Sequence, residues 1–284
     1  DRVEYRHAFG RGHPEVIGAE GRRFMGNAGA IVGGNEIGRD HAPGLIGLGM
    51  IGKTIQYIGT AAHAGGSPHL GVNALNAAHL ALGAIHAQRE TFRDADTVRV
   101  HPIITKGGAA VNSVPADVRL ETYVRASNVP AILNASEKID RALRAGALAT
   151  GASVRIQTNP GYLPAKYDDS LTELYRNNAS SLVGDDNVIN RNHSTGCTDV
   201  GDVSQIIATI QPTANATSGN GHGIDYLVDN YDLAVLKAGK AMGMTVIDLL
   251  AGNGATGNNI SGAFKAPLTI SKYLERMRSF RSDV

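Results

Sequence analysis

The strongest constraint on the fold is a hydrophobic period that changes between about two and about 3.6 along residues 53–162. Residues 117–125 alternate strictly, with Val118, Leu120 and Val124 facing one way and charged or polar residues the other. This pattern is typical of a strand with one buried face. Residues 53–58, 98–105 and 154–156 predict three further strands, because they are rich in β-branched side chains or alternate in the same way. Residues 73–90 and 130–147 instead carry apolar side chains at helical spacing.

Both predicted helices have recognisable starts. Asn73 can cap the first helix, and Pro130 lies in the first turn of the second helix, behind Ser127 or Asn128 as the cap. The order of elements is then strand, helix, strand, strand, helix, strand. This order predicts a ferredoxin-like (βαββαβ) sandwich, in which two helices cover one face of an antiparallel sheet.

The flanking regions have a different character. Residues 1–50 mix charge, glycine and short apolar pieces without a sustained period. After residue 164 the sequence predicts α/β structure: a helix at 170–183, a strand at 206–210, and a polar glycine-rich loop at 212–223. It then predicts a helix at 233–250, a flexible glycine and asparagine loop at 251–262, and an amphipathic helix at 268–280.

Composition narrows the classes of function. A chain of 284 residues suits one large domain or two ordinary ones. The formal net charge of +1 comes from scattered basic residues, so we expect no nucleic-acid partner. No apolar run approaches the roughly 20 residues that span a bilayer, so we expect no membrane partner. The single cysteine, Cys197, excludes an internal disulfide and favours a reducing, cytoplasmic location.

A glycine-rich motif at residues 47–54 matches two nucleotide-binding patterns. It satisfies the phosphate-loop pattern G-x-x-x-x-G-K-T, and its first six residues satisfy G-x-G-x-x-G. Both patterns need a helix directly after the loop, because the phosphates bind at the helix N-terminus. Residues 54–60 are rich in β-branched residues and form a poor helix. We therefore favour a hinge into the sandwich and keep nucleotide binding as a lesser hypothesis.

Polar residues in glycine-rich loops are the candidates for chemistry. His63 and His222 each have small neighbours that would let a ligand approach closely, and imidazole is a common metal ligand. Asn112 lies in a loop between two predicted strands, and Arg125 could hold a carboxylate through two hydrogen bonds. Asp199 could support a neighbouring site or cap a helix. Taken singly, each of these residues is more often structural than functional.

In combination these segments resemble a known family. Residues 59–75, 106–116 and 123–125 look like the dimerisation domain of the aminoacylase, hippurate hydrolase and carboxypeptidase G2 metallopeptidases, and their details are closest to the aminobenzoyl-glutamate hydrolase branch. Residues 198–204 and 219–222 resemble the C-terminal catalytic loops of that family. The resemblance implies an incomplete α/β metallopeptidase catalytic domain with the ferredoxin-like module inserted as a lid and dimerisation domain. It divides the chain into a catalytic remnant at 1–50, a lid at 51–165 and a C-terminal catalytic part at 166–284.

The resemblance also implies roles for individual residues. His222 would bind one of two divalent ions, zinc by preference or manganese or cobalt, and Asp199 would support the metal-binding loop. His63 would reach the active site of a partner subunit and polarise the scissile carbonyl there. The remaining candidates, Asn112, Arg125 and Gly219, would bind a small amide substrate. The implied protein is a homodimer that hydrolyses an N-acyl amino acid, an aminoacyl-glutamate or a dipeptide.

One part of the family pattern is missing. The general-base glutamate and the other metal ligands should precede the lid, but the acidic residues and histidines of residues 1–50 do not have that spacing; they are His7, His13, His41, Glu15, Glu20 and Glu36. Together with a start at Asp1, this predicts a truncated chain that can lack its metal. The alternative is a non-catalytic dimerising homologue that has lost the metal site.

Overall fold

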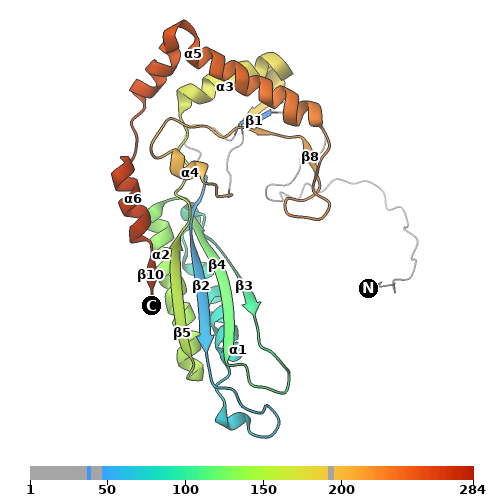
Figure 1. Cartoon of the computed structure of the whole chain (residues 1–284), viewed down its shortest axis with the longest axis vertical. Coiled ribbons are helices and arrows are strands. Elements are labelled where there is room, and N and C mark those ends of the chain that lie inside the picture. The colour runs from blue at the N-terminus through green and yellow to red at the C-terminus, as the bar shows by residue number, and fades with distance from the viewer. Residues whose placement is uncertain (1–36, 40–46, 191–194) are drawn as a thin grey trace, which may run out of the picture.

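A computed structural model describes residues 37–39, 47–190 and 195–284, so the six candidate ligands within residues 1–50 lie outside the described residues. The chain forms an elongated lid, built on one antiparallel sheet, and an upper region that contains two stacked helices (Figure 1). We use "lid" for the sheet and helices of residues 49–160, and "upper region" for the elements of residues 169–263 together with the short strand at 37–39.

The lid has the predicted order of strands and helices. Its elements are β2 (Gly49–Ile58), α1 (Ala74–Ala87), β3 (Arg99–Lys106), β4 (Asp117–Ala126), α2 (Val129–Thr150) and β5 (Ser153–Pro160). The strands pair antiparallel in the order β5-β2-β4-β3, and both helices lie on one face of the sheet (Figure 1). The predicted ferredoxin-like sandwich is confirmed.

The helix boundaries follow from the capping residues. The Asn73 side chain accepts hydrogen bonds from the amides of Leu75 and Asn76, and the Asn128 side chain accepts one from the amide of Ala131. Each cap satisfies donors that have no partner within the helix. Gly151 ends α2 with a φ of +75°, a conformation that costs glycine little.

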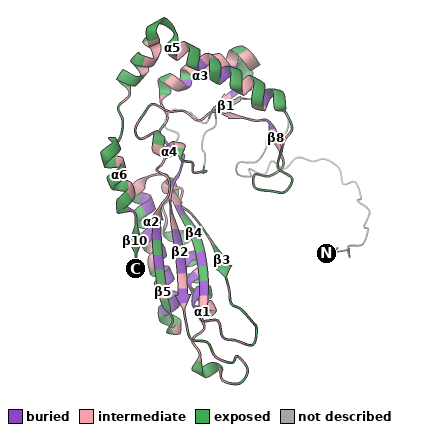
Figure 2. Cartoon of the chain, in the orientation of Figure 1, coloured by how far each residue is buried: buried purple, intermediate pink, exposed green. Residues whose placement is uncertain are grey.

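The lid core lies between the sheet and the two helices, where buried residues concentrate (Figure 2). Alternate residues of β2 and β4 point inward and meet apolar residues of α2; they are Ile51, Ile55, Tyr57, Val118, Leu120, Val124, Ile132, Ile139 and Leu143. Helices α1 and α2 approach closely because Gly146 leaves its side-chain space to α1; a Cβ there would lie 2.2 Å from the carbonyl oxygen of Ala77.

This core also contains a buried polar layer. The Nζ atom of Lys53 lies 2.7 Å from Oδ1 of Asp140 and donates a 2.8 Å hydrogen bond to Oγ1 of Thr158. The Lys53 side chain is fully buried, and this burial lowers its pKa even though the carboxylate of Asp140 acts in the opposite direction.

The end of the chain returns to the lid. Helix α6 (Ile270–Ser279) confirms the predicted amphipathic helix, and the two-residue strand β10 (Ser282–Asp283) pairs with the edge of β5. Leu268 and Phe280, on either side of α6, join the lid core. The region 166–284 therefore does not form one body, because its last segment packs on the lid sheet.

The upper region is less regular. Helix α3 (Asp169–Val183) was predicted, and it packs against α5 (Ala238–Ala263) beside a three-stranded sheet; the strands of this sheet are β6 (Val188–Asn190), β1 (Ile37–Arg39) and β7 (Thr213–Ala214). A π-helix (Asp232–Lys237) leads into α5. A short 3-10 turn lies at Asp185–Asn187 in the upper region, and three more occur in the lid at Pro68–Leu70, Arg89–Thr91 and Asp94–Asp96.

Two predictions for the upper region are wrong. No strand forms at 206–210; this segment continues from α4 (Val200–Val203) as a turn, in which the amides of Ile206 and Ile207 bond to the carbonyl of Val203. Residues 251–262 are not a loop throughout, since α5 breaks only at 251–254, where three residues have positive φ, and then continues to Ala263.

The nucleotide-binding motif does not have the required structure. Residues 49–58 form strand β2, so a strand stands where both patterns need a helix N-terminus. Within the described residues, no helix is long and apolar enough to cross a membrane.

Candidate functional site

Two of the predicted site residues come together at the end of the lid farthest from the upper region (Figure 1). We call this end, formed by residues 59–73 and 107–116, the lid tip. His63 forms an isolated antiparallel bridge with Ser113, and the amide of Ala64 donates a 2.9 Å hydrogen bond to the carbonyl of Asn112. The two segments are 49 residues apart in sequence at His63 and Asn112, yet they form one exposed unit.

The His63 ring is held by its own turn. Its Nδ1 accepts hydrogen bonds from the amides of Gly65, at 3.2 Å, and Gly66, at 2.9 Å. A Cβ at Gly65 or Gly66 would lie 3.5 or 3.4 Å from the ring, an ordinary van der Waals contact, so the turn packs directly against the imidazole. Because Nδ1 is an acceptor, the ring proton lies on Nε2, which faces away from the turn as a donor. The His63 side chain is exposed.

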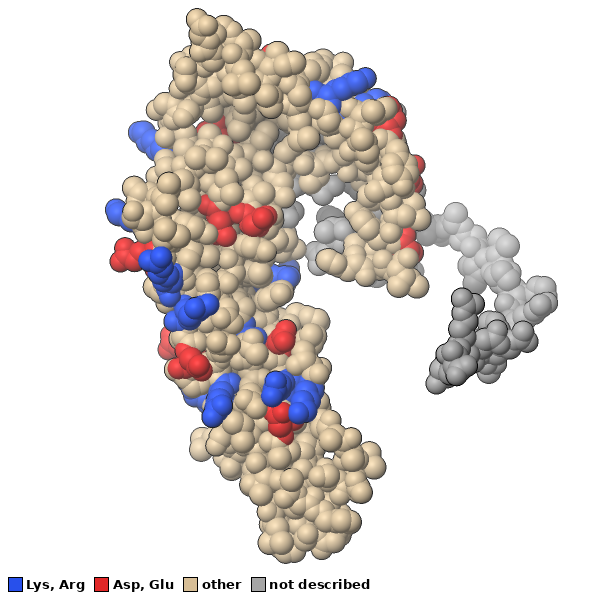
Figure 3. Space-filling view, in the orientation of Figure 1, with Lys and Arg blue, Asp and Glu red and all other residues tan. Residues whose placement is uncertain are grey.

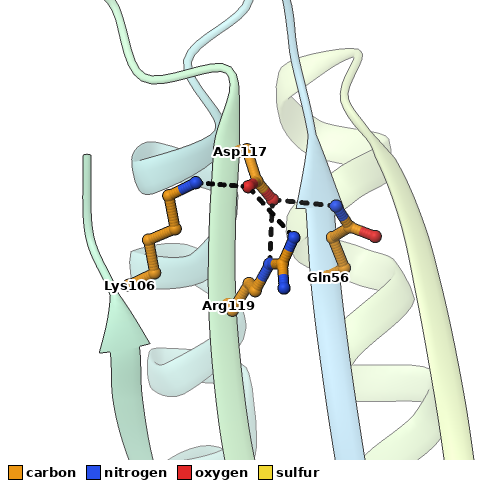
Figure 4. Close-up of polar contacts among 4 residues, drawn as sticks. All are labelled: Gln56, Lys106, Asp117 and Arg119. Atoms are coloured by element: carbon orange, nitrogen blue, oxygen red, sulfur yellow. Dashed lines mark hydrogen bonds and ion pairs between the residues drawn. The ribbon is translucent and has the colours of Figure 1, made fainter. Parts of the chain in front are cut away.

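A charged cluster fixes the strands from which the lid tip projects (Figure 4). The carboxylate of Asp117, the first residue of β4, accepts hydrogen bonds from Lys106 on β3 at 2.6 Å and from Gln56 on β2 at 2.8 Å. Arg119 adds a third contact at 3.3 Å. These hydrogen bonds hold the pKa of Asp117 well below its ordinary value, and the bond from Lys106 has the largest effect. The cluster therefore ties three neighbouring strands together at the base of the lid tip.

Arg125 lies at the other end of β4. Eight residues separate it from Asp117, which corresponds to roughly 27 Å along a strand. Its guanidinium lies 5.5 Å from the centre of the Tyr123 ring, and its Nε is buried without a hydrogen-bond partner in the described part of the chain. Within one chain, therefore, Arg125 cannot share a small substrate with His63 or Asn112.

A cavity of about 600 Å³ surrounds Arg125 on the face of the sheet that the helices leave open. Residues from all four lid strands line it, among them Arg99, His101, Tyr123 and Asn159, together with Tyr162 just after β5. Sequence reasoning found Arg125 but not Arg99 or His101. The alternation of β3 placed both on one face, yet which residues of β4 they would meet depends on the strand register.

The segment around Asp199 packs into the junction between lid and upper region. Gly201 approaches the lid so closely that a Cβ would lie 2.1 Å from the carbonyl oxygen of Leu163, and the amide of Leu163 donates a 2.8 Å hydrogen bond to Asp202. Burial raises the pKa of Asp202. Burial also raises the pKa of the Cys197 thiol to about 11, although the charge of Arg125 acts against this. Asp199 itself is exposed.

Gly219 and His222 lie in the turn of a small hairpin, between β8 (Thr217–Ser218) and β9 (Leu227–Val228). Gly219 has a φ of +80°, and a Cβ there would lie 2.3 Å from the carbonyl oxygen of Asp225. His222 also has a positive φ, of +67°, which is uncommon for a residue with a side chain. Its side chain is exposed.

The described residues do not by themselves form a metal site. Among them, no group of three or more His, Cys, Asp or Glu side chains is placed to hold an ion. A divalent ion needs several such donors, so His222 would need partners from outside this part of the chain. The donor set in hand therefore does not fit a metal pair.

Comparison with known proteins identifies the class of the lid. Residues 48–150 match the M20 family model described as the peptidase dimerisation domain. The match covers nearly the whole lid, so the lid is similar in sequence to this family's dimerisation domain.

Relatives extend the likeness beyond the lid. Xaa-Arg dipeptidase of Mus musculus is 32% identical over 207 residues, which make up 69% of this chain and 47% of that protein. The chain thus spans about half the length of the curated relative it matches. The chain is a homologue of peptidases of this family.

Solved structures show the same fold at low identity. A putative aminohydrolase from methicillin resistant Staphylococcus aureus superposes with a TM-score of 0.55 at 16% identity, covering 75% of this chain and 54% of the other. The aminopeptidase PepT from Bacillus cereus gives a TM-score of 0.52 at 18% identity, covering 79% and 54%. Both likenesses reach past the dimerisation domain into the upper region.

Proposed function

We propose that this chain contributes the dimerisation lid and part of the substrate site of a metal-dependent amidohydrolase. The substrate class is an amide next to a free carboxylate: an N-acyl amino acid, an aminoacyl-glutamate or a dipeptide. The proposal rests on the positions of two groups that suit such a substrate and lie near opposite ends of β4. An imidazole N–H donor lies at the lid tip, and a carboxylate-binding guanidinium lies at the other end of the strand.

Each group suits one part of such a substrate. Nε2–H of His63 can donate to an amide carbonyl and stabilise the negative charge that develops on its oxygen during hydrolysis. The guanidinium of Arg125 can hold a carboxylate through paired hydrogen bonds. A homodimer with two-fold symmetry brings the lid tip of one copy to the cavity of the other, so that each site takes one group from each copy.

The lid has an edge suited to such pairing. Strand β10 covers the β5 edge of the sheet, whereas no described strand pairs with the outer edge of β3. Ile103 and Ile104 on β3 are half exposed. An unpaired strand edge with exposed apolar side chains is a natural site for a second copy.

Metal dependence is part of the proposal, supported by the family and by the sequence context of His222. A bound divalent ion such as zinc, manganese or cobalt would supply an activated water and polarise the amide carbonyl. Donors outside the described residues would have to complete its site. The residues described here bind and orient the substrate and stabilise charge on its carbonyl oxygen.

The test is complementation between two variants of the complete protein that carries this chain, assayed on N-acyl amino acids and dipeptides with zinc, manganese or cobalt. We expect H63Q and R125Q each to lower kcat/KM by about a hundredfold. A mixture of the two should regain about a quarter of the wild-type activity, because half of the dimers are mixed and each mixed dimer has one intact site. No recovery on mixing would contradict a site shared between copies.

A matched histidine controls for effects on folding. His69 is exposed in the 3-10 turn that follows His63, and in the described chain it makes no side-chain hydrogen bond. The variant H69Q should keep its activity within about twofold, as expected for an exposed side chain without contacts. An equal loss in H69Q and H63Q would show that the loop fold, not the imidazole of His63, carries the effect.

A second candidate is a dimerising homologue without hydrolytic activity. It is favoured by the absence of a three-donor metal group among the described residues. Sedimentation and metal analysis separate the two hypotheses. A stable dimer of the complete protein that holds no divalent ion and hydrolyses none of the substrates would support this second candidate.

A further inference from the structure

Two arginines lie directly opposite each other on the open face of the lid sheet. The register pairs Arg99 of β3 with Arg125 of β4, and both side chains line the same cavity. Opposed residues of an antiparallel pair have Cα atoms roughly 4.5–5.5 Å apart. Like charges in this arrangement destabilise a sheet unless an anion or a counter-charge lies between them.

Arg99 is exposed and the Arg125 guanidinium lies over the Tyr123 ring, but the described chain offers the two arginines little opposite charge. In that part of the chain neither forms a salt bridge, and the one side-chain hydrogen bond of Arg99 is a 3.3 Å contact with its neighbour's carbonyl. The Nε of Arg125 is buried without a partner, a costly state for a donor that no ligand satisfies. Glu121 also lines the cavity, but Tyr123 lies between it and Arg125 on the same face of β4.

We infer that Arg99 and Arg125 together form a two-anion site, and that Arg99 selects substrates with a second acid group beside the free carboxylate. The inference rests on the proposed function and refines its substrate class. Arg125 holds the α-carboxylate, and Arg99 binds a side-chain carboxylate such as that of a C-terminal glutamate. His101, two residues from Arg99 on the same face of β3, adds a further donor to this wall of the cavity.

The inference predicts that this chain and its mouse relative prefer different side chains at the C-terminal residue of the substrate. The matched mouse protein is named for dipeptides that end in arginine. A cavity with two opposed guanidinium groups repels a third one, so a basic side chain should bind more weakly than an acidic or an amide side chain.

The test is equilibrium binding to the 284-residue chain by calorimetry at low ionic strength, with a neutral chelator present so that no metal takes part. The ligands are N-acetyl-L-glutamate, N-acetyl-L-glutamine, which matches it in shape without the second charge, and N-acetyl-L-arginine. We expect the glutamate ligand to bind about tenfold more tightly than the glutamine ligand, as one charge-assisted contact provides. The arginine ligand should bind most weakly.

Two variants test whether Arg99 causes the preference for the glutamate ligand. R99Q should reduce the ratio of the two affinities to about one and leave glutamine binding nearly unchanged. R155Q is the matched control, because Arg155 is exposed on β5 and does not line the cavity; it should leave the ratio as in the wild type. Circular dichroism checks that each variant is folded.

Several results would overturn the inference: equal binding of the two ligands by the wild type, no binding of either, tighter binding of the arginine ligand, or equal losses in R99Q and R155Q. Because the assay needs neither metal nor turnover, its outcome is separate from that of the proposed function. If the protein prefers the glutamate ligand but hydrolyses no amide, the two-anion site is supported and the proposed amidohydrolase activity is contradicted.

Discussion

The lid and the upper region differ in how they treat large apolar side chains. Among the described residues, the large apolar side chains that are fully buried lie between Leu48 and Leu163, in or directly beside the lid, with the exception of Leu233 in the upper region. The π-helix and α5 of the upper region instead expose more than half of each of several apolar side chains; they are Val235, Leu236, Met242, Val246, Ile247 and Leu250. The space-filling view shows the two signs of charge interspersed over the middle of the molecule, with further charges at the upper right, and uncharged stretches at the top and at the lower end of the lid (Figure 3).

This difference shows which part of the chain carries its own stability. In the lid, two helices cover one whole face of a sheet whose strands reach ten residues. In the upper region the strands are two or three residues long, and α5 packs on α3 along one side only. Burial of apolar surface is the main stabilising contribution to folding. The lid thus has the core of an independent unit, whereas in the upper region one face of α5 has no partner among the described residues.

The largest expected effect comes from removing the same side chain in the two regions. Leu120 is fully buried in β4, and Leu250 is 69% exposed in α5. L120A should lower the free energy of unfolding by about 3–5 kcal/mol, because it leaves a cavity, and L250A should change it by no more than about 0.5 kcal/mol. Urea denaturation followed by circular dichroism measures both. Similar losses in the two variants would mean that α5 is covered in solution.

Removing the buried charge of Lys53 tests how much the polar layer contributes to the stability of the lid core. K53M removes the ammonium and leaves the carboxylate of Asp140 without its partner. We expect a loss of about 3 kcal/mol, at the lower end for a broken buried pair, because the Asp140 side chain is still 18% exposed. The double variant K53M/D140L should recover most of this loss, since an apolar pair can replace a buried ion pair.

The same lysine predicts a pH dependence. Its pKa is lowered in the folded state, so the unfolded chain binds more protons between that lowered value and the ordinary 10.5. Stability therefore rises with pH across this window, and K53M should remove that contribution. A wild-type slope that is flat or reversed relative to K53M would contradict the burial of Lys53 as a charged group.

The junction between the two regions can be tested at the lone cysteine. Burial raises the pKa of Cys197 to about 11, so at pH 8 its thiolate is rare compared with that of a free thiol near 8.5. Alkylation by iodoacetamide should be about a hundredfold slower than in urea and should accelerate up to about pH 11. Rapid labelling at pH 8 would show that the junction opens and that the two regions move apart.

The lid could be predicted from the sequence because its signals are local. Strict alternation marks β4, helical spacing marks α1 and α2, and Asn73 and Asn128 mark where the helices begin. These patterns agree with one another, which is what a self-contained core requires.

The upper region and the cavity depend on information that local patterns do not contain. The apolar residues at 206–210 suggested a strand, but the amides of Ile206 and Ile207 bond to the carbonyl of Val203 in a turn after α4, and residues 208–210 are irregular. The glycines and asparagines at 251–262 suggested a loop, yet only the break at 251–254 is non-helical. The pairing of Arg99 with Arg125 follows from strand register, and the metal-binding role that we propose for His222 would need donors outside the described residues.

The smallest expected change in stability comes from replacing either of two glycines, one on each lid helix, by alanine. Gly83 on α1 has open space where a Cβ would go, whereas a Cβ at Gly146 on α2 would lie 2.2 Å from the backbone oxygen of Ala77. G146A should therefore push the helices apart and cost about 1–3 kcal/mol despite the better helix propensity of alanine. G83A should stabilise the lid by about 0.5–1 kcal/mol, because it gains that propensity without a clash. Thermal unfolding of both variants gives opposite shifts if α1 and α2 are as tightly packed as the lid core requires, and shifts of the same sign would mean that they are not.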